Sequence, residues 1–370
     1  MNDKKKILFI LDHLKGGGAE QISLDVANNL AKIHDVTIAL LDAKNIRMPI
    51  SGSINQIDLN INSKLMRGNL WRNKKLTLND LNKIKILAEN KYDLIVLSHW
   101  YALHLASYMD GNVWVWVHGE IFNPRQQPTN NLFRWYKEKR RVILEKKYFN
   151  KLLNGKNLIF VNKALKESYK PYIPQSKTKV IYNGIDEIRL KKDLNNTNEI
   201  KWDCIFIGRL SSEKQPEYAI KAFASSNLQG KMAVIGDGQL LEKLKNLAIE
   251  LNVEKRIDFL GWQDKPAIFI KQSKILIMSS KQEGFGLVIA EAILLETPVI
   301  AFNCSEGVNY QLNTPTLSKG LVPPQDLDQL TVKLNEIYNH PYKISATDKK
   351  RLSIQATIKE FESLLQIKSD

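Results

Sequence analysis

Short apolar runs of strand length alternate with amphipathic stretches of helical length along the whole chain. This alternation is typical of βαβ units, in which helices bury both faces of a parallel sheet. The predicted strands are 7–11, 36–41, 94–97, 113–117, 158–161, 179–182, 204–207, 232–235, 257–260, 275–278 and 298–302. The predicted helices are 20–31, 78–90, 132–153, 216–224, 240–251, 287–295 and a terminal helix at 348–367. An α/β protein with parallel sheets follows.

The length of 370 residues exceeds what one hydrophobic core usually serves. A polar stretch at 186–201 has little to bury and is predicted to be a linker. We therefore expect two doubly wound, Rossmann-like domains, 1–185 and 186–345, facing a cleft. A C-terminal helix within 346–370 has no docking site that the sequence reveals, and the first domain is the candidate.

The positive charge lies in one half of the chain. Residues 1–185 hold 30 Lys and Arg against 15 Asp and Glu, whereas residues 186–370 hold 24 against 24. The excess concentrates at 64–75 and 132–149, where basic residues mix with aromatic ones such as Trp71 and Trp135. Both segments suit an anionic lipid surface, and the alternative is a solvated helix face whose aromatic side chains pack inward.

Several classes of protein are disfavoured by composition. No motif that reads DNA or RNA accompanies the charge, so we expect no nucleic-acid partner. Cys204 and Cys304 lie far apart and form neither a disulfide framework nor a zinc motif, which favours a reducing compartment. The N-terminal apolar run, 7–11, is too short for a signal peptide or a membrane span, so a cytoplasmic protein is expected.

A glycine-rich loop, 15–20, follows the first predicted strand and opens a helix. Its backbone N–H groups can approach an anion closely, and the helix dipole favours negative charge there. The loop departs from the dinucleotide fingerprint GxGxxG, because Gln21 stands where its last glycine would fall. A phosphate site and a merely tight strand-to-helix turn both remain open.

The second half carries a basic pair and an acidic pair. Arg209 and Lys214 follow a predicted strand at its carboxyl end, where open α/β sheets bind ligands, and they suit a diphosphate. Glu283 and Glu291 flank the glycine-containing start of a predicted helix. Carboxylates accept hydrogen bonds from sugar and ribose hydroxyls, so this segment favours an extended polyol ligand.

These segments together resemble the retaining glycosyltransferases of family 4, which use nucleotide sugars on a two-domain GT-B fold. The resemblance spans nearly the whole chain. The matching segments are 16–20, 117–119, 180–186, 208–214, 234–238, 259–262, 283–291, 297–301 and 321–324.

The resemblance implies a role for each matching residue. The residues that it places at the donor are Gly17, Gly18, Arg209, Lys214, Trp262, Glu283, Gly284, Phe285, Gly286, Leu287 and Glu291. Arg209 and Lys214 would hold the diphosphate, Glu291 the ribose and Glu283 the hydroxyls of the transferred sugar. His118 would lie near the anomeric carbon and shape the acceptor site, although a packing histidine fits its position equally well; His99 has the same ambiguity without motif support.

Two segments depart from the family pattern or mimic another one. Glu296 stands where the family usually has glycine, and 303–310 replaces a loop that often carries Gly and Glu. Asp326 and Asp328 match the DxD pattern with which another glycosyltransferase architecture binds metal, yet they precede an amphipathic stretch and favour a helix N-terminus instead. We expect no metal and no cofactor.

The predicted function is retaining transfer of a hexose or N-acetylhexosamine from a nucleotide sugar, with UDP as the expected nucleotide. The positive first domain favours a glycan or polyprenyl-diphosphate-linked acceptor, or a lipopolysaccharide core, at the inner face of a bacterial membrane. The alternatives are a nucleotide-sugar epimerase of the same fold and a non-catalytic basic binding protein.

Overall fold

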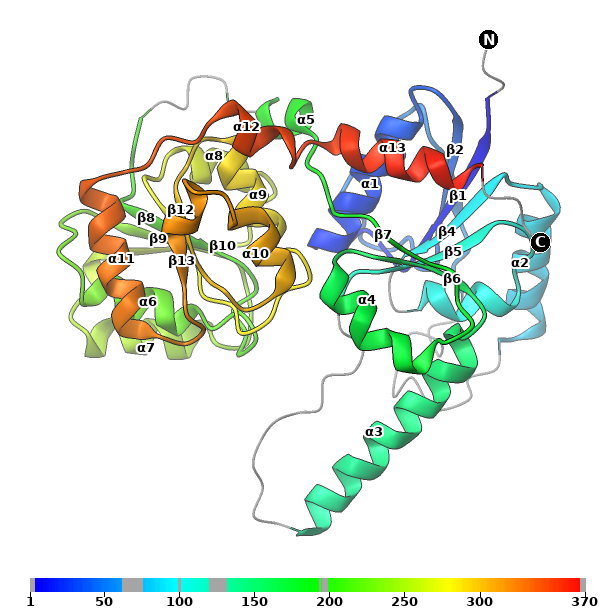
Figure 1. Ribbon diagram of the computed structural model, residues 1–370, viewed down its shortest axis with the longest axis horizontal. Coiled ribbons are helices and arrows are strands. Elements are labelled where there is room, and N and C mark those ends of the chain that lie inside the picture. The colour runs from blue at the N-terminus through cyan, green and yellow to red at the C-terminus, as the bar shows by residue number, and fades with distance from the viewer. Residues whose placement is uncertain are drawn as a thin grey trace. The chain divides into compact units, whose positions relative to one another are not determined.

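The computed structural model describes residues 4–61, 76–98, 101–119, 132–192, 194 and 199–366, without the side chains of 132, 134, 138 and 145. The chain divides into two compact units (Figure 1). Unit 1 runs to Tyr182 and resumes at Thr357, while unit 2 comprises Asn183–Ala356. The expected basic segment 64–75 and His99 lie outside the described residues.

Unit 1 is built on a parallel sheet in the order β3-β2-β1-β4-β5-β6-β7. Its strands are β1 (Lys6–Leu11), β2 (Asp35–Leu40), β3 (Asn55–Asp58), β4 (Leu94–Ser98), β5 (Val113–Val117), β6 (Asn157–Phe160) and β7 (Thr178–Val180). Its helices are α1 (Gly18–Leu30), α2 (Leu78–Glu89), α3 (Leu132–Leu153), α4 (Lys163–Tyr169) and α13 (Ile354–Leu364), with 3-10 turns η1 (Ala102–Ser107) and η2 (Lys170–Tyr172). The apolar central strands are buried, as their sequences predict.

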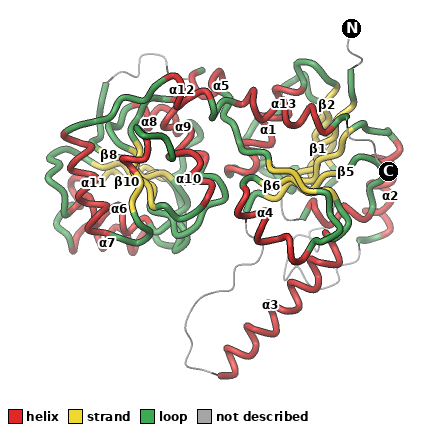
Figure 2. The backbone as a smooth tube through the Cα atoms, viewed as in Figure 1, coloured by secondary structure: helices red, strands yellow, loops and turns green. Residues whose placement is uncertain are grey.

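Unit 2 repeats the architecture with the parallel order β10-β9-β8-β11-β12-β13. Its strands are β8 (Cys204–Ile207), β9 (Met232–Ile235), β10 (Ile257–Gly261), β11 (Leu276–Met278), β12 (Val299–Phe302) and β13 (Leu321–Val322). Its helices are α5 (Glu187–Lys191), α6 (Pro216–Ala224), α7 (Leu241–Glu250), α8 (Pro266–Lys271), α9 (Leu287–Leu294), α10 (Glu306–Leu312), α11 (Leu327–Asn339) and α12 (Ala346–Lys350), with 3-10 turns η3 (Glu254–Arg256) and η4 (Leu317–Gly320). Helices flank the strands of each sheet (Figure 2), so both units are Rossmann-like.

The terminal helix expected over 348–367 is wrong as a single element. It is divided into α12 and α13, because the intervening chain pairs with another segment: Ser353 forms a parallel bridge with Ile185. From Thr357 onward the second piece belongs to unit 1, where Phe361 is fully buried against Phe9 and Trp116, with ring centroids 6.2 and 4.8 Å apart.

The linker expected over 186–201 is also corrected at its start. Asp186 caps α5 by accepting hydrogen bonds from the backbone N–H groups of Ile188 (3.0 Å) and Arg189 (3.1 Å). Leu190 is buried in unit 2. The overall polarity of 186–201 predicted a linker, but the segment begins with the five-residue helix α5. This helix is held by the buried Leu190 side chain and by the capping carboxylate of Asp186.

Candidate functional site

Three loops meet at the carboxyl edge of the unit 2 sheet, where β8, β9 and β10 end. Backbone hydrogen bonds join them: Gly208 N–H donates to Ile235 O (3.0 Å), and Gly236 N–H donates to Gly261 O (2.8 Å). Gly236 has φ +128°, and a Cβ there would lie 2.0 Å from Gly208 O, so only glycine permits this contact. The loop that carries Arg209 is therefore held in place by its neighbours.

The structure brings Lys214 and Glu283 together. The Lys214 ammonium forms an ion pair with the Glu283 carboxylate, which also accepts a hydrogen bond from Ser280 Oγ (2.8 Å). The two side chains are 27% and 11% exposed. Arg209 lies on the same loop as Lys214 and is exposed. Two cations and one carboxylate of the predicted site thus share this edge of the sheet.

The start of α9 is fixed by α10. Gly286 takes a left-handed conformation (φ +83°) at the N-cap of α9. The Gln311 side-chain amide donates to Phe285 O and to Gly307 O (3.2 Å), and a Cβ on Gly307 would lie 2.2 Å from Gly284 O. The Phe285 side chain is buried, so only its backbone is available to a ligand.

Glu291 lies on α9 and is 9% exposed. Its carboxylate forms an ion pair with the Arg189 guanidinium at 3.7 Å. Arg189 comes from α5, inside the segment expected to be a linker, and sequence reasoning missed it. The signal that could have found α5 is Asp186, an N-cap residue directly before an acidic first turn.

Trp262 follows β10 at the same edge of the unit 2 sheet. Its side chain is 43% exposed, and its indole N–H donates to Asp264 Oδ1 (3.0 Å). An exposed aromatic ring beside these loops is available to stack on a planar ligand.

Glu296, the departure from the family's glycine, takes the conformation that favours glycine. Its φ is +62°, and it follows the last turn of α9, where Thr297 N–H donates to Ala292 O (2.9 Å). Its carboxylate pairs with Lys349 at 2.6 Å, and this contact lowers its pKa. Glu296 therefore ends α9 in the backbone conformation that glycine usually provides, and its side chain adds a salt bridge with Lys349.

Asp326 confirms the helical interpretation of the DxD pattern. It is the N-cap of α11 and accepts a hydrogen bond from the backbone N–H of Gln329 (2.9 Å), while Asp328 lies in the first turn. Among the described residues no group of three or more His, Cys, Asp or Glu side chains could hold a metal ion.

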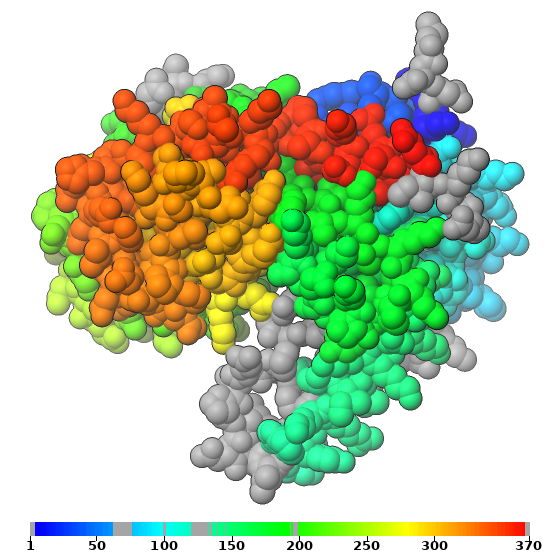
Figure 3. All heavy atoms as spheres, viewed as in Figure 1, coloured from blue at the N-terminus to red at the C-terminus, as the bar shows by residue number. Residues whose placement is uncertain are grey.

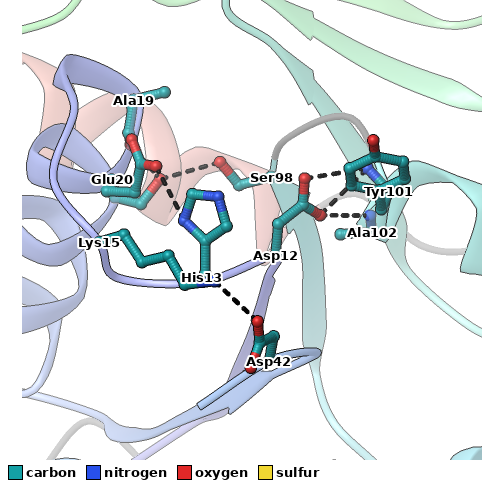
Figure 4. A network of polar contacts seen from close by, with 10 residues as sticks. Asp12, His13, Lys15, Ala19, Glu20, Asp42, Ser98, Tyr101 and Ala102 are labelled. Carbon is teal, nitrogen blue, oxygen red and sulfur yellow. Dashed lines mark hydrogen bonds and ion pairs between the residues drawn. The ribbon is translucent and has the colours of Figure 1, made fainter. Parts of the chain in front are cut away.

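In unit 1 the β1–α1 loop holds a cluster of charged side chains that sequence reasoning did not select (Figure 4). Asp12 is 4% exposed and accepts hydrogen bonds from the backbone N–H groups of Tyr101 (3.0 Å) and Ala102 (2.7 Å). Burial raises the pKa of Asp12 to about 7 despite these bonds. The signal for it was the position of Asp12 directly after an apolar strand.

His13 and Glu20 close the glycine loop of unit 1. His13 Nδ1 lies 3.2 Å from Glu20 Oε1, and the hydrogen bond with this carboxylate raises the pKa of His13 (Figure 4). A Cβ on Gly17 would lie 2.4 Å from Glu20 Oε2. The predicted phosphate loop, Gly17 and Gly18, therefore borders a carboxylate that is already paired with a histidine.

His118 follows β5, at the carboxyl edge of the unit 1 sheet. Its Nε2 lies 2.8 Å from Ser98 Oγ at the end of β4, and its ring centroid lies 4.5 Å from that of Trp116. Sequence reasoning selected His118 but missed Ser98, which directly follows the predicted strand 94–97 and ends the observed β4. The histidine is held by a specific polar contact.

The helix α3 coincides with its predicted range, but the inward packing of its aromatic residues is wrong for its first half. Phe133, Trp135, Tyr136 and Ile143 are exposed, whereas Phe149 near its end is buried. Lys137 lies over the Phe133 ring at 4.5 Å and Lys139 over the Trp135 ring at 4.0 Å. In Figure 1 its first half extends away from the sheet of unit 1, and Figure 3 shows its atoms at the surface. No described helix is long and apolar enough to cross a membrane.

Two family models match the chain in series. The model of Glycosyltransferase Family 4 matches residues 16–189, and that of Glycosyl transferases group 1 matches residues 187–358. Together they span both units.

Relatives match over parts of the chain. An uncharacterized glycosyltransferase of Methanocaldococcus jannaschii is 32% identical over 196 residues, which cover 48% of this chain and 47% of the relative. The lipopolysaccharide 1,6-galactosyltransferase of Salmonella typhimurium is 27% identical over 171 residues, which cover 45% of this chain and 46% of that relative. A UDP-Gal:alpha-D-GlcNAc-diphosphoundecaprenol alpha-1,3-galactosyltransferase of Escherichia coli is 30% identical over 147 residues, or 36% and 38%. The chain spans about half the length of the first relatives it matches.

Solved structures match the fold over almost the full length. HepE of Anabaena in complex with UDP and glucose has a TM-score of 0.70 at 20% identity, covering 98% of this chain and 99% of that one. Sucrose-phosphate synthase from Thermosynechococcus elongatus has a TM-score of 0.74 at 19% identity, covering 98% of both chains. The chain has two Rossmann-like units, and the two family models match consecutive segments of it. It therefore belongs to the group 1 glycosyltransferases of family 4, an enzyme family with the GT-B fold.

Proposed function

We propose that the protein transfers a hexose or N-acetylhexosamine from a nucleotide sugar, with UDP as the nucleotide, and retains the anomeric configuration. The observation that carries the proposal is the cluster at the carboxyl edge of unit 2, where Arg209, Lys214 and Glu283 gather beside the glycine-capped start of α9. Cations and helix N-termini bind a diphosphate, and a fixed carboxylate binds sugar hydroxyls. HepE, a structural relative, is known in complex with UDP-glucose.

In this proposal the transfer depends on electrostatic stabilisation of the departing diphosphate. The bond between the anomeric carbon and the phosphate oxygen breaks, and its electron pair leaves with the phosphate, which Arg209, Lys214 and the N-terminus of α9 stabilise. The acceptor oxygen forms the new bond on the same face, and its proton passes to the departing phosphate. These charges suffice without a catalytic metal.

The remaining residues position the substrates. Glu283, held by Lys214 and Ser280, accepts hydrogen bonds from the sugar, and Glu291 accepts them from the ribose. The backbone of 284–287 and that of Gly17 and Gly18 contact the phosphates. Trp262 stacks beside the base, and His118 shapes the acceptor site.

Calorimetric titration with UDP and with GDP tests the donor site. We expect UDP to bind more tightly than GDP, and the double change Arg209→Ala and Lys214→Ala to weaken binding at least about a hundredfold, since each charged contact contributes about 1.5–3 kcal/mol. Glu291→Gln should weaken binding about tenfold. Lys245→Ala, which removes an exposed cation paired with Glu242, is the matched control. If neither nucleotide binds, or the double variant binds as the wild type does, the assignment fails.

Product analysis then separates transfer from epimerisation. With a UDP-sugar and a glycan acceptor we expect a glycoside of unchanged anomeric configuration. An inverted product would contradict the retaining mechanism, and a new free sugar nucleotide formed without acceptor would identify an epimerase.

For the acceptor we propose a glycan carried on a lipid, as a polyprenyl diphosphate or a lipopolysaccharide core, used in bacterial cell-surface polysaccharide synthesis at the inner face of the plasma membrane. Relatives include a lipopolysaccharide galactosyltransferase and an enzyme named for a diphosphoundecaprenol acceptor. The first half of α3 presents exposed aromatic rings beside lysines, a combination that suits the surface of anionic lipid.

Sedimentation with liposomes tests the membrane surface. The protein should bind vesicles that contain anionic lipid more strongly than neutral ones. Changing Lys139 and Arg140 to Glu should reduce this binding at least about tenfold, at about 1 kcal/mol per charge removed, and Trp135→Ala should reduce it further. The double change Lys243→Glu and Lys245→Glu, at two exposed positions of unit 2, is the charge-matched control. Equal binding to both vesicle types would refute the lipid surface.

A further inference from the structure

Two buried serines and the partly buried His118, from three separate segments of unit 1, are joined by a continuous series of hydrogen bonds. Ser23 Oγ on α1 lies 2.8 Å from Ala19 O and 2.9 Å from Ser98 Oγ at the end of β4. Ser98 Oγ in turn lies 2.8 Å from His118 Nε2. Ser23 and Ser98 have no exposed surface, so solvent does not reach their hydroxyl groups.

The direction of this chain follows from the number of hydrogens. A serine hydroxyl has one hydrogen to donate, and a carbonyl oxygen only accepts. Because Ala19 O can only accept, its hydrogen bond with Ser23 uses the Ser23 hydrogen, and the contact between the serines then requires Ser98 to donate to Ser23. Ser98 then has no hydrogen left for His118, and the imidazole must donate from Nε2 to Ser98.

We propose that Ser98 and Ser23 are positioning residues that fix His118 as the Nε2–H tautomer. In the neutral ring the lone pair is then on Nδ1, which can accept a hydrogen bond but not donate one. The part that this ring plays at the acceptor sugar rests on the proposed function of His118, whereas the tautomer follows from the serines alone. The neighbouring Trp116 ring, 4.5 Å away between centroids, restricts rotation of the imidazole.

This series of hydrogen bonds links His118 to the glycine-rich loop that precedes α1. The chain of donors ends on Ala19 O, in the first turn of α1, directly after Gly17 and Gly18. Ser23 is linked to His118 through Ser98, so its hydroxyl decides which way the Ser98 hydrogen points. A substitution at Ser23 should therefore change the protonation pattern of the His118 ring.

Nuclear magnetic resonance of the full chain labelled with ¹⁵N-histidine tests the proposal. At about pH 9, where a histidine of ordinary pKa is neutral, we expect Nε2 of His118 to be protonated and Nδ1 to be unprotonated. The chain has 6 histidines, and the His118 signal is identified by its absence in His118→Gln. A wild-type ring protonated on Nδ1 instead would overturn the proposal, without need of any variant.

The variants separate tautomer control from packing. Ser23→Ala frees the Ser98 hydrogen to donate to His118, so the Nδ1–H form should rise about fivefold relative to wild type, the bias that one hydrogen bond supplies. Ser98→Thr keeps a hydroxyl and should preserve the wild-type pattern. Ser273→Ala is the matched control, because Ser273 is also buried and donates to the carbonyl four residues earlier, Phe269 O (2.8 Å).

An unchanged His118 tautomer in Ser23→Ala, as in Ser273→Ala, would refute the relay. The magnetic resonance measurement uses neither a nucleotide sugar nor an acceptor glycan. Failure of the proposed function would instead appear as absent UDP binding in calorimetry, so the two failures are distinguishable.

Discussion

Replacing Asp12 by asparagine should remove much of the pH dependence of the stability of unit 1. Asp12 Oδ1 accepts hydrogen bonds from the backbone N–H groups of both Tyr101 (3.0 Å) and Ala102 (2.7 Å). The carbonyl oxygen of asparagine can accept the same two bonds. Asp12→Asn thus keeps the two bonds to Oδ1, loses the contact of Oδ2 with the Tyr101 N–H (3.1 Å), and removes the group that titrates.

The magnitude follows from the pKa. Burial raises the pKa of Asp12 from 3.8 to about 7, which corresponds to about 4 kcal/mol at 1.36 kcal/mol per pKa unit. Because the pKa of Asp12 is higher in the folded chain, its contribution to the free energy of unfolding is fully present below pH 3.8. This contribution falls as the pH rises and is lost above about pH 7. The free energy of unfolding of the variant minus that of the wild type should therefore increase by about 4 kcal/mol between pH 4 and pH 8.

Urea unfolding followed by hydrogen exchange of residues 94–106 measures this difference, since a chain of two units does not unfold in one step. Asp110→Asn, at an exposed position of the same unit, is the control and should show no such trend. A difference between Asp12→Asn and wild type that stays constant across this pH range would refute the assignment of a buried, titrating Asp12.

Three further substitutions test the packing that surrounds the sites. Phe361→Ala should cost unit 1 about 3–5 kcal/mol in urea unfolding because the ring is fully buried, whereas Ile86→Ala, at a 64% exposed position, should cost under about 0.5; equal losses would contradict the docking of α13. Glu296→Gly should stabilise unit 2 by about 0.5–1 kcal/mol, since relief of a left-handed backbone exceeds the loss of an exposed ion pair, and a lower melting temperature would disprove this balance. Gly307→Ala should displace the backbone at Gly284 and weaken UDP binding at least about tenfold; unchanged affinity would show that this backbone does not contact the nucleotide.

Local signals predicted most of the sheet. The predicted strands 204–207 and 232–235 coincide with β8 and β9, because uninterrupted apolar runs between polar segments are the sequence form of buried parallel strands. β3 was missed since it is a polar, largely exposed edge strand that is defined by pairing with β2. The terminal helix was predicted as one element, because the pairing of Ser353 with Ile185 that divides it is a contact between distant segments.

The sequence by itself determined which chemical groups are available: the cations after β8, the carboxylates around α9, and the histidine after β5, each placed by the rule that strand ends carry function. Only the tertiary structure decided their partners. Glu283 is paired with Lys214, Glu291 with Arg189, and His118 with Ser98, in each case across elements separated along the chain. The direction of a hydrogen bond and the pKa of Asp12 depend on burial and on atoms within about 3 Å. The periodicity of a sequence does not specify distances between side chains that lie far apart along the chain.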